Sequence, residues 1–589
     1  MSLPKSRNAA KENQFSPISE DRMPGHTLRR LFYLANDNMH KYLIYPLTNE
    51  YLCDTIALAT KERTVLPMFH FSGKKVLATA LASVLCMASV GASACTSVYV
   101  GADLTADGTT LLARSEDLSN SYNKMYFAIP AGVHKAGELY NGCYGFTYTF
   151  TKDSYSYNAF QDDNGAGVDS VCPDCGSTHT HTPYQSAGTN EKGVTVSASE
   201  ALSSSAVLKE TDPFKADGIE QAEIPTILLS EASTAKEAVD LLLGIYDASG
   251  CNTGSGIFIA DNEEAWYIEN TTGTQYVAVK LNSSLVLAQP NMSIIGLIDL
   301  DDTENVKASA DLIATAEKAG TYVGDKEANT IDYVASYNSD QAVKDRMVSA
   351  LTYFSEANAK EELTPDDYTL SNVNEAGEIV PLYSNIMLDH PWTIEDAVGY
   401  YHVAGIGHVR NMETHIFQIA AEDSILDTVE WIAMDDTAVS VFVPYYPMLT
   451  TDTYAAYQLS TAKAEFVTEE PTEGVYYAAA TTTKNEAGEQ ITVEGYKVLP
   501  ANWADSCYWT FDALSNLYEY GNLTDEQKAD VDAKLAALQD DCYAVFEEMK
   551  TAVAAASSTE EAAAVATKLS MDAAQQVHEA AVALVNAVK

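Results

Sequence analysis

The chain has 589 residues, of which 46% are apolar and 20% are charged. This composition is typical of a globular soluble protein that is long enough to bury a large core. The 83 acidic and 35 basic residues give a formal charge of −48. Such a charge repels nucleic acid and anionic lipid, so we expect neither as a partner.

Two N-terminal segments precede the globular part. Residues 1–67 show no clear strand or helix periodicity, and we interpret them as a non-native or disordered extension, with translation starting at Met68; the alternative is a long leader. Residues 68–94 have the pattern of a signal peptide, in which a Lys-Lys pair precedes an apolar run and Ala92-Ser93-Ala94 forms a cleavage site. The run has about 15 residues, too few to span a membrane. We therefore predict an exported protein, either extracellular or associated with the cell envelope.

Cleavage after Ala94 would make Cys95 the first residue of the mature chain. An N-terminal cysteine carries a nucleophilic thiol and a basic α-amine on one carbon skeleton. With ordinary pKa values of about 8.5 for the thiol and about 7.7–8.0 for the amine, a proton can pass between them near neutral pH. Two alternatives remain. In the first, Cys95 is an inert residue beside the cleavage site. In the second, it is the lipidated residue of a lipoprotein, although Ala92 stands where a lipobox normally has Leu.

The segment 95–450 is predicted to be one domain of mixed α+β structure, because paired strands alternate with helices. A strand at Thr96–Val100 is followed by an Asp-Gly turn and a second strand at Thr109–Ala113. One helix is predicted over residues 224–246, with Pro225 in its first turn, and residues 305–400 carry mainly helical signals. Further strands are expected at Gly193–Ser199, Ser255–Ala260, Ala265–Glu269, Tyr276–Lys280, Ser284–Ala288, His415–Ala420, Val429–Met434 and Val439–Val443.

Residues 451–589 are predicted to form a linker and an Ala-rich helical hairpin that packs on this domain. A capping box at Leu523–Gln527 precedes the first of two long helical stretches, about 525–555 and 558–588. A shorter helix at 506–521 would pack with them. Because Cys507 and Cys542 lie at similar distances on either side of the turn, we predict a disulfide between them.

Two short motifs combine residues that acyl-transfer chemistry needs. Arg114 and Asp117 follow the second strand, which would bring them back to Cys95. There Arg114 could stabilise a thiolate and Asp117 could orient a charged α-amine; alone, the pair is better explained as a surface ion pair. Asn190 precedes Gly193 at the edge of another strand and could donate to an oxyanion, although Asn and Gly also favour ordinary turns.

Taken together, these motifs resemble one family, the cysteine N-terminal-nucleophile dipeptidases (dipeptidase A). A more distant similarity connects them with the choloylglycine hydrolase and penicillin V acylase group. The resemblance covers most of residues 95–589, including Trp509-Thr510-Phe511 in the tail. The residues that carry it are, in order, Cys95-Thr96, Arg114-x-x-Asp117, Thr189-Asn190-Glu191-Lys192-Gly193-Val194, Pro290-Asn291 and Val443-Pro444-Tyr445-Tyr446.

The resemblance implies an αββα sandwich and a cysteine amidase site without a metal or organic cofactor. Cys95 would be the nucleophile, Arg114 and Asp117 would position and polarise it, and Asn190 would donate to the oxyanion. Asn291 would add a polar contact, and Arg410 is the candidate for a late arginine of the superfamily. The reaction would pass through a thioester that water then hydrolyses.

Residues 153–184 depart from the family pattern and read as an inserted loop. Cys172 and Cys175 with His179 and His181 could bind zinc, but export favours a disulfide between the two cysteines. Cys143 and Cys251 would then form the remaining pair, which leaves Cys95 as the free thiol.

Three functional hypotheses follow from the sequence. The leading one is an exported dipeptidase that acts on small peptides. The second is an acylase of the same superfamily that acts on N-acyl or bile-acid amides. The third is a ligand-binding surface lipoprotein lipidated at Cys95. All three hypotheses are compatible with a homo-oligomer.

Overall fold

The computed structural model describes eight stretches of the chain: residues 95–118, 122–142, 145–163, 184–200, 202–420, 428–484, 490–521 and 523–589. All of them lie in one compact unit, Ser72–Lys589. The predicted extension and signal peptide, Cys143 and the Cys/His motif at 172–181 lie outside the described residues.

A six-stranded antiparallel sheet carries the N-terminus of the described chain. Its strand order is β12-β1-β2-β18-β19-β20, so the first two strands pair with strands from much later in the sequence. All five residues of β1 are buried, because it lies between β12 and β2. The strands are β1 (Thr96–Val100), β2 (Thr110–Asp117), β12 (Val286–Gln289), β18 (Asn411–Ile419), β19 (Val429–Met434) and β20 (Val443–Tyr445).

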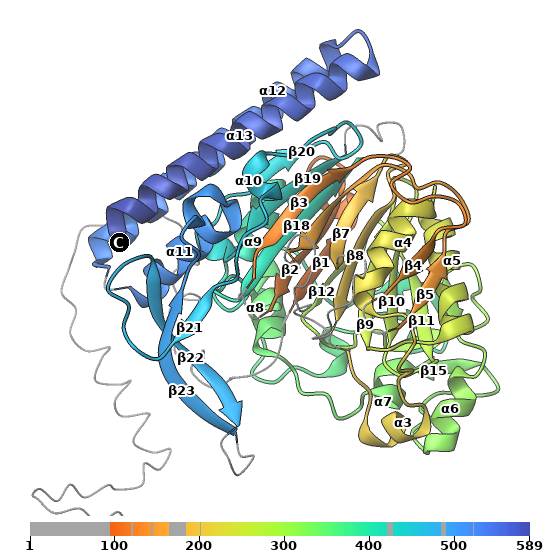
Figure 1. Cartoon of the computed structure of the whole chain (residues 1–589). Helices are drawn as coiled ribbons and strands as arrows, with labels where there is room; N and C mark the ends of the chain where they lie inside the picture. Colours follow the sequence, from red (N-terminus) through yellow and green to blue (C-terminus); the bar gives the residue numbers. More distant parts are fainter. Residues whose placement is uncertain are drawn as a thin grey trace, which may run out of the picture. The chain divides into compact units, whose positions relative to one another are not determined.

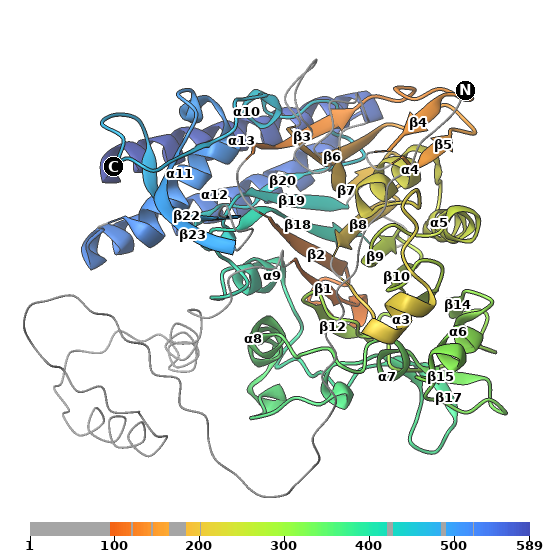
Figure 2. The same cartoon turned by 60° about the horizontal axis from the view of Figure 1, so that its bottom comes forward.

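An eight-stranded antiparallel sheet with the order β14-β11-β10-β9-β8-β7-β6-β3 faces the first one. Side chains of β2 and β8 meet between the two sheets, and Figures 1 and 2 show the sheets lying against each other. The strands are β3 (Lys124–Ile129), β6 (Tyr157–Asp162), β7 (Gln185–Asn190), β8 (Thr195–Glu200), β9 (Ser255–Ala260), β10 (Ala265–Asn270), β11 (Tyr276–Leu281) and β14 (Val306–Ala308).

Helices cover the outer faces of both sheets. On the eight-stranded sheet, α4 (Ile224–Glu231) packs on β7 and β8, and α5 (Ala235–Ser249) packs on β9 and β10, around a separate apolar cluster. On the six-stranded sheet, α8 (Asp345–Phe354) packs on β12, and α9 (Ile394–Tyr401) packs on β2 and β18. The predicted α+β class with antiparallel sheets is confirmed.

Shorter elements complete this part of the chain. The helices are α3 (Ala206–Thr211), α6 (Leu312–Ala319) and α7 (Tyr333–Tyr337). Small two-stranded sheets are formed by β4 (Leu139–Asn141) with β5 (Thr147–Thr149), β13 (Leu297–Asp299) with β15 (Thr330–Asp332), and β16 (Ser371–Val373) with β17 (Ile379–Tyr383).

Several predicted elements differ from the structure. The second strand, predicted at Thr109–Ala113, runs from Thr110 to Asp117 and therefore contains Arg114 and Asp117. The single helix predicted at 224–246 is two helices, because the Thr234 hydroxyl accepts a hydrogen bond from Glu237 N (3.1 Å) and starts α5 as a new N-cap. The predicted strand Val439–Val443 is instead a 3₁₀ turn at Thr437–Val439 that leads into β20. The inserted loop begins later than residue 153, since Tyr157–Asp162 form β6.

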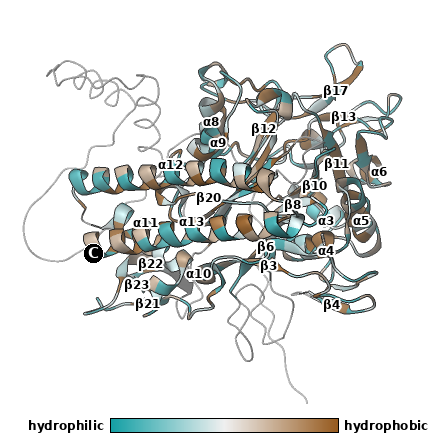
Figure 3. Cartoon of the chain, turned by 90° about the horizontal axis from the view of Figure 1, so that it is seen from above, coloured by the Kyte–Doolittle hydropathy of each residue, from teal (hydrophilic) through white to brown (hydrophobic). Residues whose placement is uncertain are grey.

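The C-terminal part contains the predicted hairpin of α12 (Asp525–Ala555) and α13 (Thr559–Val588), which pack on each other and on β20. In Figure 3 both helices carry hydrophilic and hydrophobic residues along their length, as helices with one face in water do. A three-stranded sheet that was not predicted, ordered β21-β23-β22, lies in the segment expected to be a linker. Its strands are β21 (Glu465–Val467), β22 (Tyr476–Lys484) and β23 (Gln490–Val498), and α10 (Ala455–Gln458) and α11 (Cys507–Tyr520) flank it.

The predicted disulfide between Cys507 and Cys542 is wrong, because both are free, buried thiols. The prediction assumed that the helix at 506–521 folds back along the next helix. In the structure α11 packs on α13, and the hairpin partner of α12 is also α13. Both thiols fill the apolar core instead. Cys251 is also a free, buried thiol, which contradicts its predicted pairing with Cys143.

A search of the helices in the described residues finds none that is both long and apolar enough to cross a membrane.

We predict that Cys507 and Cys542 stay unmodified by iodoacetamide in the native protein and are both alkylated after unfolding without reductant. Burial raises the pKa of Cys542 to about 12, so the native thiol is neither exposed nor ionised. Peptide mass mapping checks this. A peptide pair linked through these two cysteines would contradict it.

Candidate active site

Arg114 lies at the centre of the candidate site because of its place on β2. In the ladder it stands opposite Ser97 of β1 and His415 of β18. Successive side chains of a strand point to opposite faces, so Arg114 and Glu116 share the face toward the other sheet. Arg114 is fully buried there.

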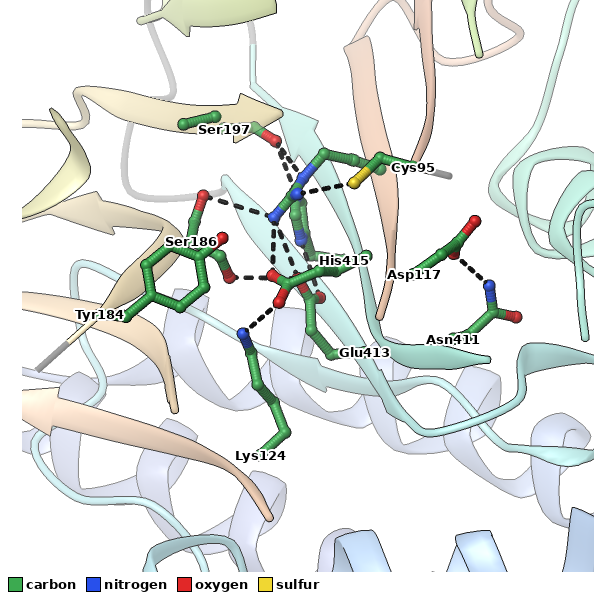
Figure 4. Close-up of polar contacts among 12 residues, drawn as sticks. Cys95, Asp117, Lys124, Tyr184, Ser186, Ser197, Asn411, Glu413 and His415 are labelled. Carbon is green, nitrogen blue, oxygen red and sulfur yellow. Dashed lines mark hydrogen bonds and ion pairs between the residues drawn. The ribbon is translucent and has the colours of Figure 1, made fainter. Parts of the chain in front are cut away.

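The guanidinium of Arg114 joins the Cys95 thiol to side chains of both sheets, among them Ser197 and Glu413, which Figure 4 labels. Its Nη1 lies 3.5 Å from Cys95 Sγ, and its Nε donates to Ser197 Oγ on β8 at 3.2 Å. Its Nη2 forms ion pairs at 3.2 Å with Glu116 and with Glu413 of β18. Two buried carboxylates thus balance the charge of Arg114 and fix its orientation.

Glu116 extends this charge cluster away from Cys95. Lys124 Nζ lies 2.7 Å from Glu116 Oε1 and 2.7 Å from Asp162 Oδ1, and the Lys124 and Asp162 side chains come from β3 and β6 of the opposite sheet. Burial would raise the pKa of Glu116, but the charges of Lys124 and Arg114 lower it below its ordinary value. The carboxylate therefore stays ionised beside Arg114.

Glu413 and His415 form a second support for Arg114 on β18. Glu413 Oε2 lies 2.9 Å from His415 Nδ1, and His415 Nε2 lies 2.8 Å from Ser197 Oγ. Ser186 Oγ of β7 donates to Glu413 at 3.3 Å. Burial lowers the pKa of His415 and outweighs the effect of Glu413, so the ring is neutral at pH 7.

The Cys95 thiol is buried at the end of this network. Burial raises the pKa of Cys95, and the charge of Arg114 opposes that rise. The thiol is thus protonated at neutral pH in the uncleaved chain, and its nearest cation is positioned to stabilise a thiolate.

Asp117 points to the other face of β2, away from the Arg114 cluster (Figure 4). The ladder between β2 and β18 shifts register between Asn411 and Glu413, and Asn411 stands opposite Asp117. Asn411 Nδ2 donates to Asp117 Oδ1 at 2.6 Å, and His408 Nε2 lies 3.3 Å from Oδ2. Two neighbours from the start of β18 therefore hold this carboxylate in place.

Arg346 of α8 connects Asp117, Cys95 and Asn291. Its guanidinium donates to the Cys95 carbonyl and to Thr96 Oγ1 (2.5 Å), and it lies 3.8 Å from Asp117 Oδ2. Its Nη2 donates to Asn291 Oδ1 at 2.9 Å. Arg346 thus fixes the backbone of the first described residue and the side chain of Asn291.

The structure gives Asn190 a role other than the predicted oxyanion contact. Its Nδ2 donates to the carbonyls of Leu229 (2.9 Å) and Ala232 (2.8 Å), and its Oδ1 accepts from Lys192 N and Val194 N. Both amide hydrogens therefore bind the C-terminal end of α4, and the amide oxygen closes the turn after β7.

Arg410 does not occupy the place expected for the late arginine. Its carbonyl accepts from Leu118 N at 3.0 Å, and no hydrogen bond or ion pair joins its side chain to Cys95 among the described residues. Arg346 makes the contacts that Arg410 was expected to make. Burial lowers the pKa of Arg346, and the positive charge of Arg410 contributes to this lowering, so the two guanidinium groups interact electrostatically.

Arg346 and the supporting residues around Arg114 were not among the site residues predicted from the sequence. For β18 a signal was present, because polar residues alternate at Asn411, Glu413 and His415, directly before the apolar pair Ile416-Phe417. Nothing in the local sequence marks Arg346, an arginine on a half-exposed helix. Within the described stretches no group of three or more His, Cys, Asp or Glu side chains could hold a metal ion.

The sequence model described as Peptidase family C69 matches residues 94–484, about two thirds of the chain. The chain belongs to this family. This confirms the resemblance to the dipeptidase A group and shows that the chain is a hydrolase of a cysteine peptidase family.

Two curated relatives illustrate the similarity. A probable dipeptidase B of Streptococcus pyogenes serotype M1 is 30% identical over 390 residues, which cover 62% of this chain and 74% of that protein. A probable dipeptidase of Salmonella dublin is 27% identical over 376 residues, which cover 60% and 81%. Both matches cover most of the relative's length.

Among solved structures, penicillin V acylase from Agrobacterium tumefaciens aligns with 61% of this chain and 87% of its own, at 13% identity and a TM-score of 0.29. A mutant of conjugated bile acid hydrolase from Clostridium perfringens aligns with 60% and 96%, at 13% identity and a TM-score of 0.28. Scores of this size do not establish a common fold.

We predict that Arg346→Lys lowers kcat/KM for dipeptide hydrolysis, measured with protein that begins at Cys95, roughly tenfold to a hundredfold, whereas Arg410→Lys changes it much less. A lysine cannot reproduce the forked contacts of Arg346, and a hydrogen bond to a charged group contributes about 1.5–3 kcal/mol. Steady-state kinetics of the two variants, with melting temperatures as a control for folding, check this. Equal losses in both variants would contradict the assignment.

We predict that His408 titrates above its ordinary pKa of 6.5. Burial of the ring lowers this pKa, and the nearby positive charge of Arg346 lowers it further. The carboxylate of Asp117, with a smaller contribution from Asp436, raises the pKa and outweighs both effects. Because the folded pKa is raised, the stabilisation from protonated His408 is fully present below about pH 6.5 and is lost as pH rises through the folded pKa. NMR titration of the ring checks the value. Asp117→Asn should lower it, and an unchanged pKa in that variant would refute the pairing.

Proposed function

We propose that the mature protein is an exported dipeptidase in which Cys95, freed by cleavage after Ala94, is the N-terminal nucleophile. In this proposal the two packed sheets and their outer helices are an αββα sandwich of the N-terminal-nucleophile type. The observation that carries it is the 3.5 Å contact between Cys95 Sγ and Arg114 Nη1, at the first residue before β1 in a chain of peptidase family C69. The family match beginning at residue 94 agrees with this boundary.

Arg114 would act on the thiol. Its guanidinium is buried, its charge is fixed by Glu116 and Glu413, and it cannot lose its proton. A thiolate formed at Cys95 would meet a positive charge that is already in place, so no reorganisation is needed when the charge develops.

Asp117 would act on the α-amine that cleavage creates. The Cys95 carbonyl is held by Arg346, and Arg346 also lies 3.8 Å from Asp117, so the backbone of Cys95 is on the same side as this carboxylate. An ammonium group there would be stabilised by Asp117 and would carry the proton taken from the thiol.

Asn291 is the side chain best placed to donate to an oxyanion. Arg346 donates to its Oδ1, which fixes the orientation of the amide and directs Nδ2 away from Arg346. Asn291 has a positive φ of 54°, a conformation that non-glycine residues adopt rarely and that often occurs at functional sites.

The reaction can be written with these groups alone. The α-amine takes the thiol proton, and the sulfur attacks the carbonyl carbon of the peptide bond. The ammonium then gives its proton to the leaving amino group, and a thioester remains on Cys95. Water transfers a proton to the α-amine as it attacks the thioester, and the carboxylic acid leaves with the thiol restored.

We predict that Cys95→Ser in the mature protein lowers dipeptide hydrolysis roughly a thousandfold or more while the melting temperature stays the same. The full-length chain should be as inactive, because its α-amine is in a peptide bond. Release of free amino acids from dipeptides measures both, and N-acyl amino acids serve as the alternative substrate class. An active precursor would refute the role of the amine.

The state of Cys95 in the exported protein is a separate test. Intact-mass and N-terminal analysis of protein recovered from the producing cells should give a free cysteine. A diacylglyceryl group on Cys95 with a blocked amine would refute the proposal and support the lipoprotein alternative.

A further inference from the structure

A cavity of about 390 Å³ adjoins the candidate site, and the mechanism above does not use it. This volume is within the range of small-molecule pockets. Asn291 forms part of its wall, and Arg346 links Asn291 to the Cys95 carbonyl through two hydrogen bonds. A single arginine therefore connects the wall of the cavity to the backbone of the nucleophile.

Three chain segments line the cavity, and each continues an element of the candidate site. Residues 203–209 follow β8, which supplies Ser197 to Arg114. Residues 291–292 follow β12, the partner of β1. Residues 338–344 precede α8, which carries Arg346. Figure 2 shows α3, α7 and β12 in one region of the molecule.

The side-chain amides of Asn338, which is buried, and Gln341, which is half-buried, hold one wall of the cavity rigid. Gln341 accepts from Ser293 N at 3.0 Å and donates to Ser293 O at 2.9 Å, and Asn338 donates to Gln341 at 3.1 Å. Ser205 N donates to Tyr337 O at 3.0 Å, which ties the segment before α3 to the end of α7. A ligand in this cavity would thus meet preformed walls.

The polar groups of the cavity lining are incompletely paired. Ser204 is 4% exposed, and its Oγ has no hydrogen-bond partner among the described residues. A buried hydroxyl without a partner costs free energy that a ligand can recover. Lys209 and Lys344 also line the cavity, and neither has an ion-pair partner in the described part of a chain where acidic residues outnumber basic ones 83 to 35.

We propose that this cavity is the pocket by which the enzyme selects dipeptides over longer peptides. In it, Lys209 and Lys344 bind the C-terminal carboxylate of the dipeptide, and Ser204 donates a further hydrogen bond. This inference rests on the proposed function, because it assigns the substrate terminus to the same site. A free carboxylate one residue beyond the scissile bond would then meet two ammonium groups. A longer peptide or an amidated one would place a neutral amide there and lose both contacts.

Asp340 lines the same cavity, so removing its charge tests which terminus of the substrate binds there. If the cavity binds the carboxylate, Asp340→Asn removes a repulsive charge and lowers KM. If it binds the α-ammonium of the substrate instead, Asp340→Asn raises KM and the two lysine variants lower it, which would overturn the assignment. The signs of the three effects therefore distinguish the two termini.

The experiment compares alanyl, leucyl and phenylalanyl dipeptides with their C-terminal amides and with the matching tripeptides, using mature protein that begins at Cys95. We expect the wild type to prefer the free acids, measured as the ratio of kcat/KM for the acid to that for the amide. Each of the variants Lys209→Gln and Lys344→Gln should reduce this ratio roughly tenfold to a hundredfold by raising KM for the acid. Lys318→Gln on α6, also an exposed lysine, is the matched control and should leave the preference unchanged.

A second readout does not depend on turnover. Calorimetry of mature Cys95→Ala protein should detect binding of the dipeptide, and Ser204→Ala and Lys344→Gln introduced into it should weaken that binding. Equal hydrolysis of acids and amides, with lysine variants that behave as Lys318→Gln, would overturn the pocket and leave the peptidase function standing. A mature protein that cleaves none of these peptides would overturn both.

Discussion

The buried guanidinium of Arg114 is the constraint on which the candidate site depends. A charge at this depth is tolerated only because Glu116 and Glu413 pair with it, and these carboxylates are in turn held by Lys124, His415 and Ser186. These side chains come from β2, β3, β7 and β18, so the cluster joins the two sheets at the point where the thiol lies. Buried ion pairs add little net stability, but this one fixes how the sheets align, and the position of the nucleophile follows from that alignment.

The alternation of side chains along β2 separates two tasks. Arg114 faces the opposite sheet and the thiol, whereas Asp117 faces Arg346 and His408 on the helical side. Cys95 stands at the start of the neighbouring strand, where its side chain reaches one face and its backbone reaches the other. A nucleophile that also needs its own α-amine can use both faces only from such a position.

Much of the fold could be predicted because strand periodicity is a local property. Ser255–Ala260 and Val429–Met434 have the predicted bounds, and the first long C-terminal helix begins where its capping box indicated. The errors lie where short-range signals compete. No Gly or Pro between Pro225 and Gly244 marks the break before Thr234, so one helix was predicted there. The change of composition after residue 450 was taken for a linker, although this segment contains β22 and β23.

The sequence by itself determined the family, the nucleophile candidate and the Arg114-x-x-Asp117 pair, because these follow from residue order and from one hairpin. Only the tertiary structure decided which side chains surround them. Arg346 is 251 positions from Cys95 and Glu413 is 299 positions from Arg114, and both reach the site through strand pairing and helix packing. The same holds for Asn190, which folds back onto α4, and for Cys507 and Cys542, which the packing of α11 on α13 leaves as free thiols. Sequence patterns describe what a segment can form, whereas contacts between distant segments depend on how the whole core packs.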